Sequence, residues 1–339
     1  MKILFTCYYE LKDALRLASK YLSNFNHDVL GFPLFRYYAD INDKTPEYTQ
    51  LMIDCINENS IDVILWWYFS IPTSDMEIIV KACPSVKNIM FNWDEPYNWK
   101  DCDIQNKSKF FDAVFVTCAE KLNDYVKYGT KEAFLQFPGY DSSVHNIIIN
   151  DDDDDIVKKY TCDISICCTN LYDNDRLYPN QYIKRKELVD KIYECRKKYG
   201  YSFKIFGPEK FRDIYPESYA GFVNYQDTNK VYNYSKINIC THVQYNTYKY
   251  LNERTINILG SGGLLLVDKV DGIDEILTPN VECLILDKNN YIEQIVQILS
   301  NYDDYLMIRH NANAKSKLYT WEKWASNINE YLKSLKNNS

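Results

Sequence analysis

The segment NERTINILGSGGLLLVDKVDGIDEIL (252–277) decides the fold class. Its apolar residues first follow helical spacing, and a Gly-rich stretch at 260–263 then leads into the uninterrupted apolar run GLLLVDK (263–269), which has the character of a buried strand. Glycines at such a junction let a helix end close to the next strand. A second, short helix is predicted to open at Gly272. A helix, a buried strand and another helix in this order form the repeating unit of a parallel α/β sheet.

The alternation of strands and helices continues on both sides of this segment. Downstream of residue 160, strands are predicted at 162–169, 202–208, 237–242 and 282–287, and helices at 182–200, 228–236, 290–300 and 302–335. Upstream, strands are predicted at 2–9, 27–35, 61–69, 88–96 and 111–119, and helices at 10–25, 47–60, 76–85 and 121–129. The sequence therefore predicts an α/β protein with two Rossmann-like parallel-sheet domains facing across a cleft.

The acidic run Asp151–Asp155 interrupts this pattern near the middle of the 339 residues, a length that suits two domains. Adjacent carboxylates repel one another and stay solvated, so the run is interpreted as part of a surface linker. The expected organisation is an N-terminal domain at 1–145, an acidic linker at 146–160, a C-terminal domain at 161–315 and a tail helix at 316–339.

Composition argues against several classes of function. The net charge is −8, and the most basic stretch, 184–198, is interpreted as a helix with a solvated face, so no basic surface for nucleic acid is expected. No apolar run approaches the roughly 18 residues that span a bilayer. The 11 Cys form no CxxC pair, which predicts buried, reduced thiols in a cytoplasmic protein and no metal site.

One anion-binding site is suggested by the residues alone. A helix opening at Gly272 would present free backbone N–H groups and the positive end of its dipole, which suit a diphosphate. Arg254 would add a planar cationic fork for phosphate oxygens. The alternative interpretation is that the glycines only make tight connections between helix and strand.

The block 253–277 resembles the donor-binding block of the retaining group-1 glycosyltransferases, and most closely their CgeB-like, spore-maturation branch. The matching positions are Arg254, Gly262, Gly263, Asp268, Gly272 and Glu275. Weaker similarities follow in the family's order, at FPGYDSSVH (137–145), KIFGPEKF (204–211), KVYNYSKINICTH (230–242) and LYTWEKWASNINEYL (318–332). The resemblance covers the chain from Phe137 to its end.

This resemblance implies a GT-B-like fold whose C-terminal helix returns to the N-terminal domain. It implies that the C-terminal domain binds a nucleotide-diphosphate sugar, with a UDP-sugar favoured, as co-substrate and without a cofactor. The phosphates would lie near Arg254, Gly272 and Ile273, the base along Phe206, Gly207 and Pro208, and the ribose near Asn257. The family carries a Glu at the position of Asn257. Sugar transfer would be of hexosyltransferase type, retaining and metal-independent.

The strand ends of the N-terminal domain are the expected acceptor side. Aromatic rings stack on sugar faces, and carboxylates hydrogen-bond or deprotonate hydroxyls, so the candidates are Tyr8, Tyr9 and Glu95, with Asp94 in a catalytic role. Trp66 is interpreted as sheet core. His242 follows a strand end of the other domain and is a candidate for donor contact or catalysis, against the alternative of a local hydrogen bond.

Three functions remain open from the sequence. The first is an active glycosyltransferase acting on a glycan, protein or small-molecule acceptor. The second is a catalytically weak nucleotide-sugar-binding module of the same fold, because Asn257 lacks the charge of the family's Glu. The third is a nucleotide-sugar epimerase, which needs several acid/base groups and is disfavoured by the presence of only 4 His in the whole chain.

Overall fold

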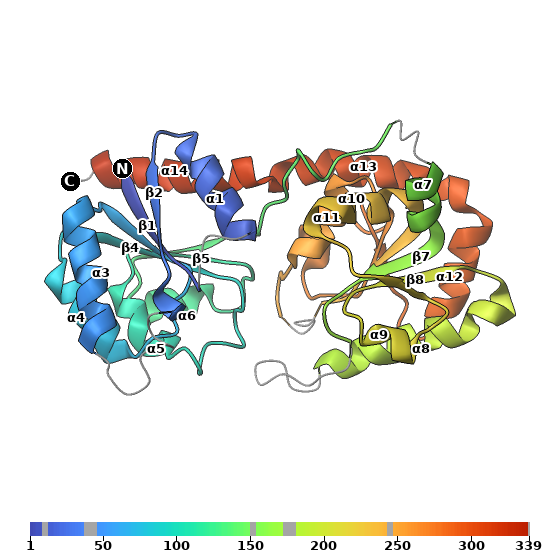
Figure 1. Ribbon diagram of the computed structural model, residues 1–339, viewed down its shortest axis with the longest axis horizontal. Helices are drawn as coiled ribbons and strands as arrows, with labels where there is room; N and C mark the ends of the chain where they lie inside the picture. The colour runs from blue at the N-terminus through green and yellow to red at the C-terminus, as the bar shows by residue number, and fades with distance from the viewer. Residues whose placement is uncertain (9–12, 37–45, 150–153, 172–180, 243–246, 338–339) are drawn as a thin grey trace. The chain divides into compact units, whose positions relative to one another are not determined.

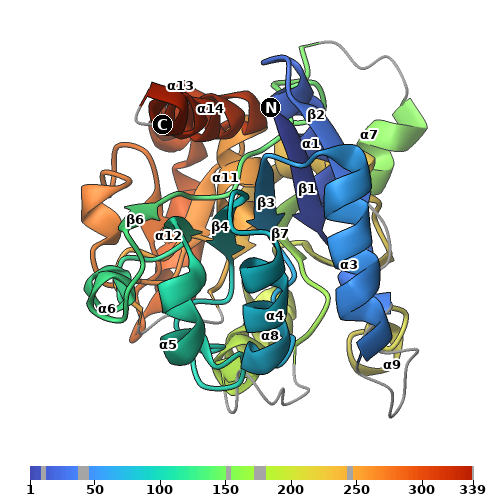
Figure 2. The ribbon, with the colours of Figure 1, turned by 90° about the vertical axis from the view of Figure 1, so that its left-hand side faces the viewer.

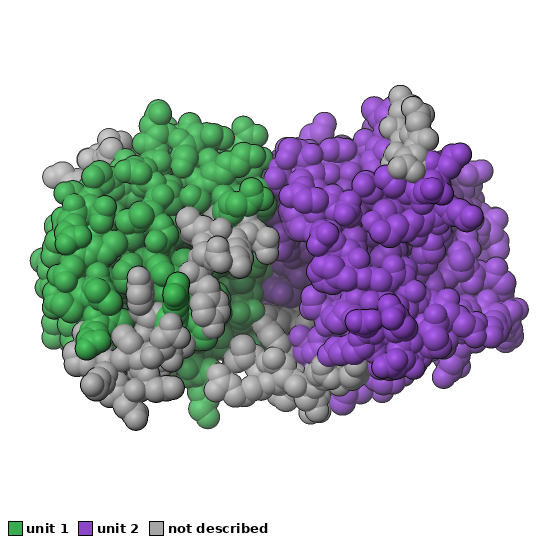
Figure 3. All heavy atoms as spheres, in the orientation of Figure 1, with its two compact units in different colours: residues 1–138, 321–339 green, residues 139–320 purple. Residues whose placement is uncertain are grey.

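The computed structural model describes residues 1–8, 13–36, 46–149, 154–171, 181–242 and 247–337. The chain divides into two compact units (Figure 3). The first unit comprises Met1–Pro138 together with Trp321–Ser339, and the second comprises Gly139–Thr320. Each unit is built around its own parallel sheet with helices on its faces (Figure 1).

The first unit has a six-stranded parallel sheet in the order β2-β1-β3-β4-β5-β6. Its strands are β1 (Lys2–Thr6), β2 (Asp28–Phe32), β3 (Val63–Trp66), β4 (Lys87–Asn92), β5 (Ala113–Val116) and β6 (Glu132–Leu135). Its helices are α1 (Asp13–Ser23), α3 (Pro46–Asn59), α4 (Thr73–Ala82), α5 (Ile104–Lys107), α6 (Leu122–Lys127) and α14 (Trp321–Asn337), with a 3₁₀ turn at Ser108–Phe110. The strands β3 and β5 are buried at every position, as expected for strands covered on both faces. Helices α3 and α4 pack side by side (Figures 1 and 2).

The second unit has a six-stranded parallel sheet in the order β12-β11-β10-β7-β8-β9. Its strands are β7 (Cys162–Cys167), β8 (Phe203–Phe206), β9 (Tyr219–Gly221), β10 (Ser235–Cys240), β11 (Leu265–Val267) and β12 (Leu284–Ile285). Its helices are α7 (Asp154–Tyr160), α8 (Gln181–Tyr199), α9 (Phe211–Ile214), α10 (Tyr225–Tyr234), α11 (Glu253–Gly260), α12 (Tyr291–Ser300) and α13 (Leu306–Ser316). The strand order reverses between β7 and β10, and ligands bind at such reversals in open α/β sheets.

Two parallel sheets with flanking helices confirm the predicted fold class, but several predicted elements were wrong in detail. The predicted strand 27–35 ends at Phe32 and is followed by a helical turn. Part of the predicted acidic linker, Asp154–Tyr160, forms α7, whereas Asp151 to Asp153 lie outside the described residues. The short helix predicted from Gly272 is only the three-residue 3₁₀ turn Ile273–Glu275.

The predicted single tail helix is interrupted. After the 3₁₀ turn Tyr302–Tyr305 and α13, a second 3₁₀ turn at Lys317–Tyr319 leads to Thr320, whose extended backbone pairs with Tyr140. The last helix, α14, then packs against α1 in the first unit. The predicted return of the C-terminal helix to the N-terminal domain is therefore confirmed, although it begins only after this break.

Aromatic side chains fix α14 to the first sheet. Trp321 and Trp324 are buried, and the ring of Trp321 stacks on that of Trp93 with centroids 5.9 Å apart. Trp324 meets Phe91 of β4 edge to face, at 5.4 Å. Trp66 is fully buried and donates its indole N–H to Asn88 Oδ1 at 2.9 Å, which confirms its interpretation as sheet core.

The Gly-rich junction after α11 has the predicted form. Gly262 has a φ of +69°, in the left-handed region that favours glycine. A Cβ added to Gly263 would lie 2.7 Å from Asn238 Nδ2 of the neighbouring strand β10. Glycine at these two positions lets α11 end directly against the sheet.

All 11 cysteines are free thiols, and nine of them are buried. In the part of the chain that the structure describes, no helix is both long enough and apolar enough to cross a membrane.

Candidate functional site

A pocket of about 400 Å³ lies at the carboxyl ends of β7 and β8, beside the reversal of strand order in the second unit. Its walls come from the ends of these strands, from α10 and from the first turns of α8 and α11. The residues used below are Cys167, Cys168, Arg185, Phe206, Gly207, Thr228, Arg254 and Asn257. This is the edge of a parallel sheet at which ligands are expected.

Two polar side chains in this pocket have atoms without a hydrogen-bond partner among the described residues. Arg254 is partly exposed, but its Nη1 is buried and unpaired, and no described carboxylate forms an ion pair with it. Asn257 Oδ1 is also buried and unpaired. Because these residues stand three apart on α11, they share one face of the helix. Buried polar atoms are rarely left unpaired, so a ligand with an anionic group and a hydroxyl would satisfy both.

The start of α11 holds this face in place. Asn252 caps the helix, and its Oδ1 accepts a hydrogen bond from the backbone N–H of Thr255 at 2.9 Å. Such a cap satisfies one of the free N–H groups of the first turn and typically stabilises a helix by about 1 kcal/mol. Arg254 therefore projects from a fixed backbone rather than from a loop.

The predicted donor residues fall into two groups. Phe206, Gly207, Arg254 and Asn257 line the same pocket. A Cβ on Gly207 would lie 2.3 Å from the carbonyl oxygen of Cys168, so only glycine fits at this strand end. Pro208 follows Gly207 and opens the turn to α9, and it is not part of the pocket wall.

The predicted anion site at Gly272 and Ile273 lies in a tight turn. The N–H of Ile273 already donates to the carbonyl of Val270 at 3.1 Å, and the three-residue 3₁₀ turn that follows has little dipole. Gly272 has a φ of +74°, and a Cβ there would lie 2.6 Å from the ring of Tyr248. The glycine is therefore required by the turn and by its close neighbour.

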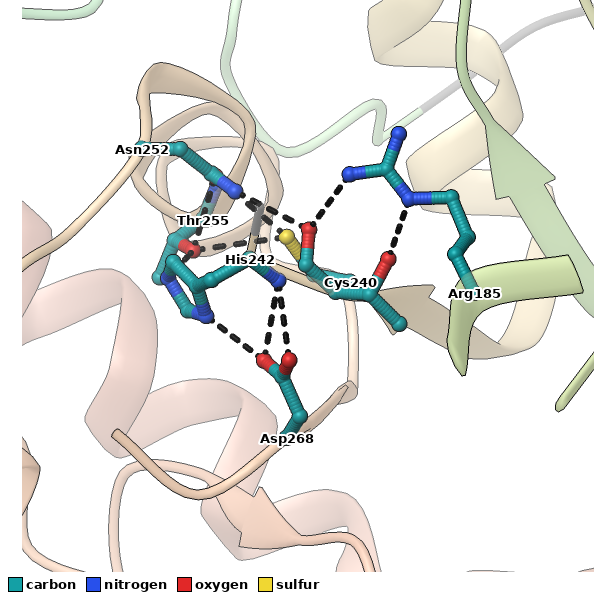
Figure 4. Close-up of polar contacts among 7 residues, drawn as sticks. Arg185, Cys240, His242, Asn252, Thr255 and Asp268 are labelled. Carbon is teal, nitrogen blue, oxygen red and sulfur yellow. Dashed lines mark hydrogen bonds and ion pairs between the residues drawn. The ribbon is translucent and has the colours of Figure 1, made fainter. Parts of the chain in front are cut away.

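His242 lies at the end of β10 with its side chain fully buried (Figure 4). Its Nδ1 lies 2.6 Å from Asp268 Oδ1, and its backbone N–H donates to both oxygens of the same carboxylate at 3.0 Å. Its Nε2 lies 3.3 Å from Thr255 Oγ1. The Thr255 hydroxyl also donates to Asn252 Oδ1 at 3.1 Å, which ties the imidazole to the cap of α11. Both ring nitrogens therefore have partners within the protein. This is the arrangement expected from the alternative in which His242 only makes local hydrogen bonds.

Arg185 is a residue that sequence reasoning missed. Its guanidinium is buried and donates from Nε to Thr241 Oγ1 at 2.7 Å, from Nη1 to the carbonyl of Asn170 at 2.9 Å and from Nη2 to the carbonyl of Thr241 at 3.1 Å. Its bonds to Thr241 hold it at the end of β10 (Figure 4). Its bond to the Asn170 carbonyl links it to the segment after β7. A signal was present in the sequence, because Arg185 stands three and four residues before Leu188 and Val189 and therefore on the buried face of α8.

In the first unit, two predicted acceptor residues follow strands of the same sheet. Tyr8 follows β1 and is 52% exposed, and its ring packs against Phe35 and Tyr68. Asp94 follows β4 and is partly exposed. Partial burial, together with the negative charge of Asp94, raises the pKa of the Tyr8 phenol. Both residues therefore lie at the carboxyl edge of the sheet, whereas Tyr9 lies outside the described residues.

Glu95 occupies an interior position, unlike its predicted place at an acceptor surface. Its side chain is inaccessible to solvent, and Oε2 accepts from Tyr125 Oη at 2.6 Å and from Asn92 Nδ2 at 3.2 Å. Burial raises the pKa of this carboxyl to about 7. Its Oε1 has no partner among the described residues. Glu95 therefore belongs to an internal polar network with Asn92 and Tyr125.

Within the described residues, no group of three or more His, Cys, Asp or Glu side chains could hold a metal ion.

Comparisons with known proteins agree with this architecture. Residues 184–330 match the model of the family described as glycosyl transferase-like. No curated protein matches the chain. The sucrose-phosphate synthase (tll1590) structure from Thermosynechococcus elongatus is similar over 100% of both chains, with 11% identity and a TM-score of 0.73.

Two further solved structures are similar over nearly the whole chain. The similarity to a glycosyltransferase from Rickettsia africae ESF-5 covers 100% of this chain and 99% of that chain, with 14% identity and a TM-score of 0.71. The similarity to Anabaena Alr3699/HepE in complex with UDP-glucose covers 98% of this chain and 100% of that chain, with 12% identity and a TM-score of 0.68. The chain therefore has the GT-B fold of these structures, and the region that matches the glycosyl transferase-like family, from α8 into α14, contains both Arg254 and Asn257.

Proposed function

We propose that this protein is a glycosyltransferase that moves a sugar from a nucleotide-diphosphate sugar, with a UDP-sugar favoured, to an acceptor hydroxyl. The observation that carries the proposal is the pair of unpaired polar atoms, Arg254 Nη1 and Asn257 Oδ1, in one pocket of the family-matched region. The similarity to a structure that contains UDP-glucose supports the choice of donor.

Each pocket residue has a role that its chemistry suits. The Arg254 guanidinium would donate to the diphosphate oxygens, and Asn257 Oδ1 would accept from a ribose hydroxyl. Phe206 and Gly207 would form the wall along the base, with Pro208 beyond them. Of the two predicted phosphate donors Gly272 and Ile273, the Ile273 N–H could donate only after its bond to Val270 opens, so Arg254 carries most of the anion binding in this proposal.

The proposed transfer is retaining, of hexosyltransferase type, and metal-independent. The acceptor oxygen bonds to the anomeric carbon as the bond from that carbon to the diphosphate breaks, and the hydroxyl proton goes to the leaving phosphate oxygen. Arg254 stabilises the negative charge that develops on the diphosphate. Asp94 accepts a hydrogen bond from the acceptor hydroxyl and orients it, and Tyr8 contributes an aromatic surface beside it.

Calorimetry with UDP tests the donor site. Arg254→Ala should weaken UDP binding by about 1.5–3 kcal/mol, or roughly 10- to 100-fold, the scale of a charged hydrogen bond. The control is Arg212→Ala, because this arginine of α9 is 61% exposed in its side chain and pairs with Glu209 on the surface. An unchanged UDP affinity in Arg254→Ala would place the donor site elsewhere.

A second candidate function is a nucleotide-sugar-binding module with little catalysis. Asn257 favours it, because a neutral amide binds a ribose hydroxyl more weakly than a carboxylate does. Release of UDP from UDP-sugars distinguishes the two functions. A transferase releases UDP from the UDP-sugar at a rate proportional to the enzyme concentration. A binding module binds UDP with the same dependence on Arg254 but releases no UDP from the UDP-sugar.

A further inference from the structure

A second pocket, of about 240 Å³, lies at the carboxyl ends of β10, β11 and β12 in the same unit. Its walls come from the first turns of α8 and α12 and from these three strand ends. The lining residues used below are Lys184, Leu188, Asp268, Lys269, Lys288 and Tyr291. Arg185 lines both pockets, and no other residue of the part of the chain that the structure describes is common to them. Three hydrogen bonds to Thr241 and Asn170 hold the Arg185 side chain in place, so it separates the two pockets.

The rim of this second pocket is cationic. Lys184, Lys269 and Lys288 surround it in a chain whose net charge is −8. Lys269 and Lys288 are exposed, and neither has an ion-pair partner among the described residues. The carboxylate of Glu187 lines the same pocket, but the three lysines outnumber it. The rim therefore favours an anionic ligand such as a phosphate.

The interior of the pocket offers an acceptor for hydroxyl groups. The Asp268 side chain is 18% exposed and is held in position by the Nδ1 and backbone N–H of His242. A carboxylate has about four acceptor positions, so it can still accept from a ligand hydroxyl. Leu188 and the ring of Tyr291 add an apolar surface of the kind that packs against a sugar face.

We propose that this pocket binds a monosaccharide phosphate, with the phosphate at the lysine rim and a sugar hydroxyl on Asp268. Pockets for drug-sized ligands have volumes of about 300–1,000 Å³, so a cavity of about 240 Å³ suits a single phosphorylated sugar better than a nucleotide sugar. The proposal does not depend on the donor site, because it uses none of the residues assigned to UDP.

Calorimetry with a panel of hexose phosphates tests this site, using the 1- and 6-phosphates of glucose, galactose, mannose and N-acetylglucosamine on the full chain. At least one should bind. The double variant Lys269→Ala/Lys288→Ala should weaken that binding by at least tenfold, because it removes the two unpaired charges. Lys197→Ala/Lys236→Ala is the matched control, since it removes two surface lysines that pair with Glu217 and Asp163 instead, and it should bind as the wild type does.

Two further measurements identify the pocket. Saturating UDP should leave the sugar phosphate bound, and Arg254→Ala should leave its affinity unchanged. Asp268→Asn should weaken the sugar phosphate more than it weakens inorganic phosphate, which lacks the sugar hydroxyls. The proposal is overturned if no panel member binds, if the lysine variant binds normally, or if UDP displaces the ligand, and none of these results bears on whether UDP itself binds.

Discussion

The strand ends of the two sheets use their polar side chains in opposite ways. After β4 in the first unit, Asn92, Glu95, Asn98 and Tyr125 bond to one another in a buried network, although Glu95 Oε1 has no partner among the described residues. After β10 in the second unit, Arg254 and Asn257 keep buried atoms without partners beside an open pocket. Two sheets of the same strand number and direction therefore differ in whether polar groups stabilise the domain or remain available to a ligand.

The physical reason lies in what a buried polar atom can do. A network within the protein recovers the desolvation cost of its members and makes the loop rigid. An unpaired atom costs free energy in the empty protein, and a ligand that pairs with it recovers that cost on binding. The four predictions below test this comparison, from the largest expected effect to the smallest.

The first prediction concerns the packing that completes the first unit. Trp321→Ala removes a fully buried indole from the contacts with Trp93 and Trp67, so the first unit should lose about 3–5 kcal/mol of unfolding free energy. All 6 Trp of the chain lie in this unit, so tryptophan fluorescence during urea unfolding follows it selectively.

The matched control for this variant is Leu318→Ala, whose side chain is largely exposed in the preceding turn. It should cost less than about 0.5 kcal/mol, as surface substitutions do. A loss below about 1 kcal/mol in Trp321→Ala would mean that α14 is not part of the core of this unit.

The second prediction concerns the buried network. Burial raises the pKa of Glu95 from about 4.5 to about 7, so the folded protein retains a proton there that the unfolded chain has lost. Stability should therefore fall as pH rises from about 4.5 to 7, by up to about 3 kcal/mol, and then level off. Glu95→Gln should abolish this fall, and Glu58→Gln, an exposed control in α3, should preserve it. Parallel curves for wild type and Glu95→Gln would contradict the prediction.

The third prediction concerns the edge of the first sheet. If Asp94 orients the acceptor, Asp94→Asn should lower turnover about 100-fold while changing UDP affinity less than twofold, because the residue contacts no part of the nucleotide in the proposed site. The kcat of UDP release and the Kd for UDP measure the two effects. Asp101→Asn, an exposed residue of the same loop, is the control. Full turnover in Asp94→Asn would remove this role.

The fourth prediction concerns the open pocket. Asn257→Glu adds a charged acceptor at the proposed ribose position, so UDP affinity should be preserved or rise by up to about tenfold. Asn257→Ala, which removes the acceptor, should weaken binding by about 0.5–1.5 kcal/mol. Calorimetry with UDP measures both, and a tenfold loss in Asn257→Glu would place the ribose away from this residue.

Much of the fold could be predicted from the sequence, since long apolar runs and helical spacing are local signals. The strands β10, β11 and β12 overlap the apolar runs from which they were predicted, whereas β9 was not predicted. The break at Thr320 was missed because residues 302–335 were predicted as one helix, and the extended backbone of Thr320 pairs with Tyr140, a residue far away in the chain. The length of the helix after Gly272 was overestimated, because a glycine followed by acidic residues occurs before long helices and before single 3₁₀ turns alike.

The candidate site was predicted only in part. Arg254 and Asn257 could be found because their spacing on one helix is a property of the sequence. Glu95 and His242 could not be assigned, because whether a carboxyl or an imidazole is open or enclosed depends on partners such as Tyr125 and Asp268, 30 and 26 residues away.

The sequence by itself determined the α/β class, the two parallel sheets and the helix that carries Arg254, because local pattern and glycine geometry are sufficient for them. Only the tertiary structure decided which polar atoms stay unpaired, that Arg185 bonds to the end of β10 and separates two pockets, and that three lysines surround the second one. These features arise from contacts between residues far apart in the chain, and no local pattern encodes them.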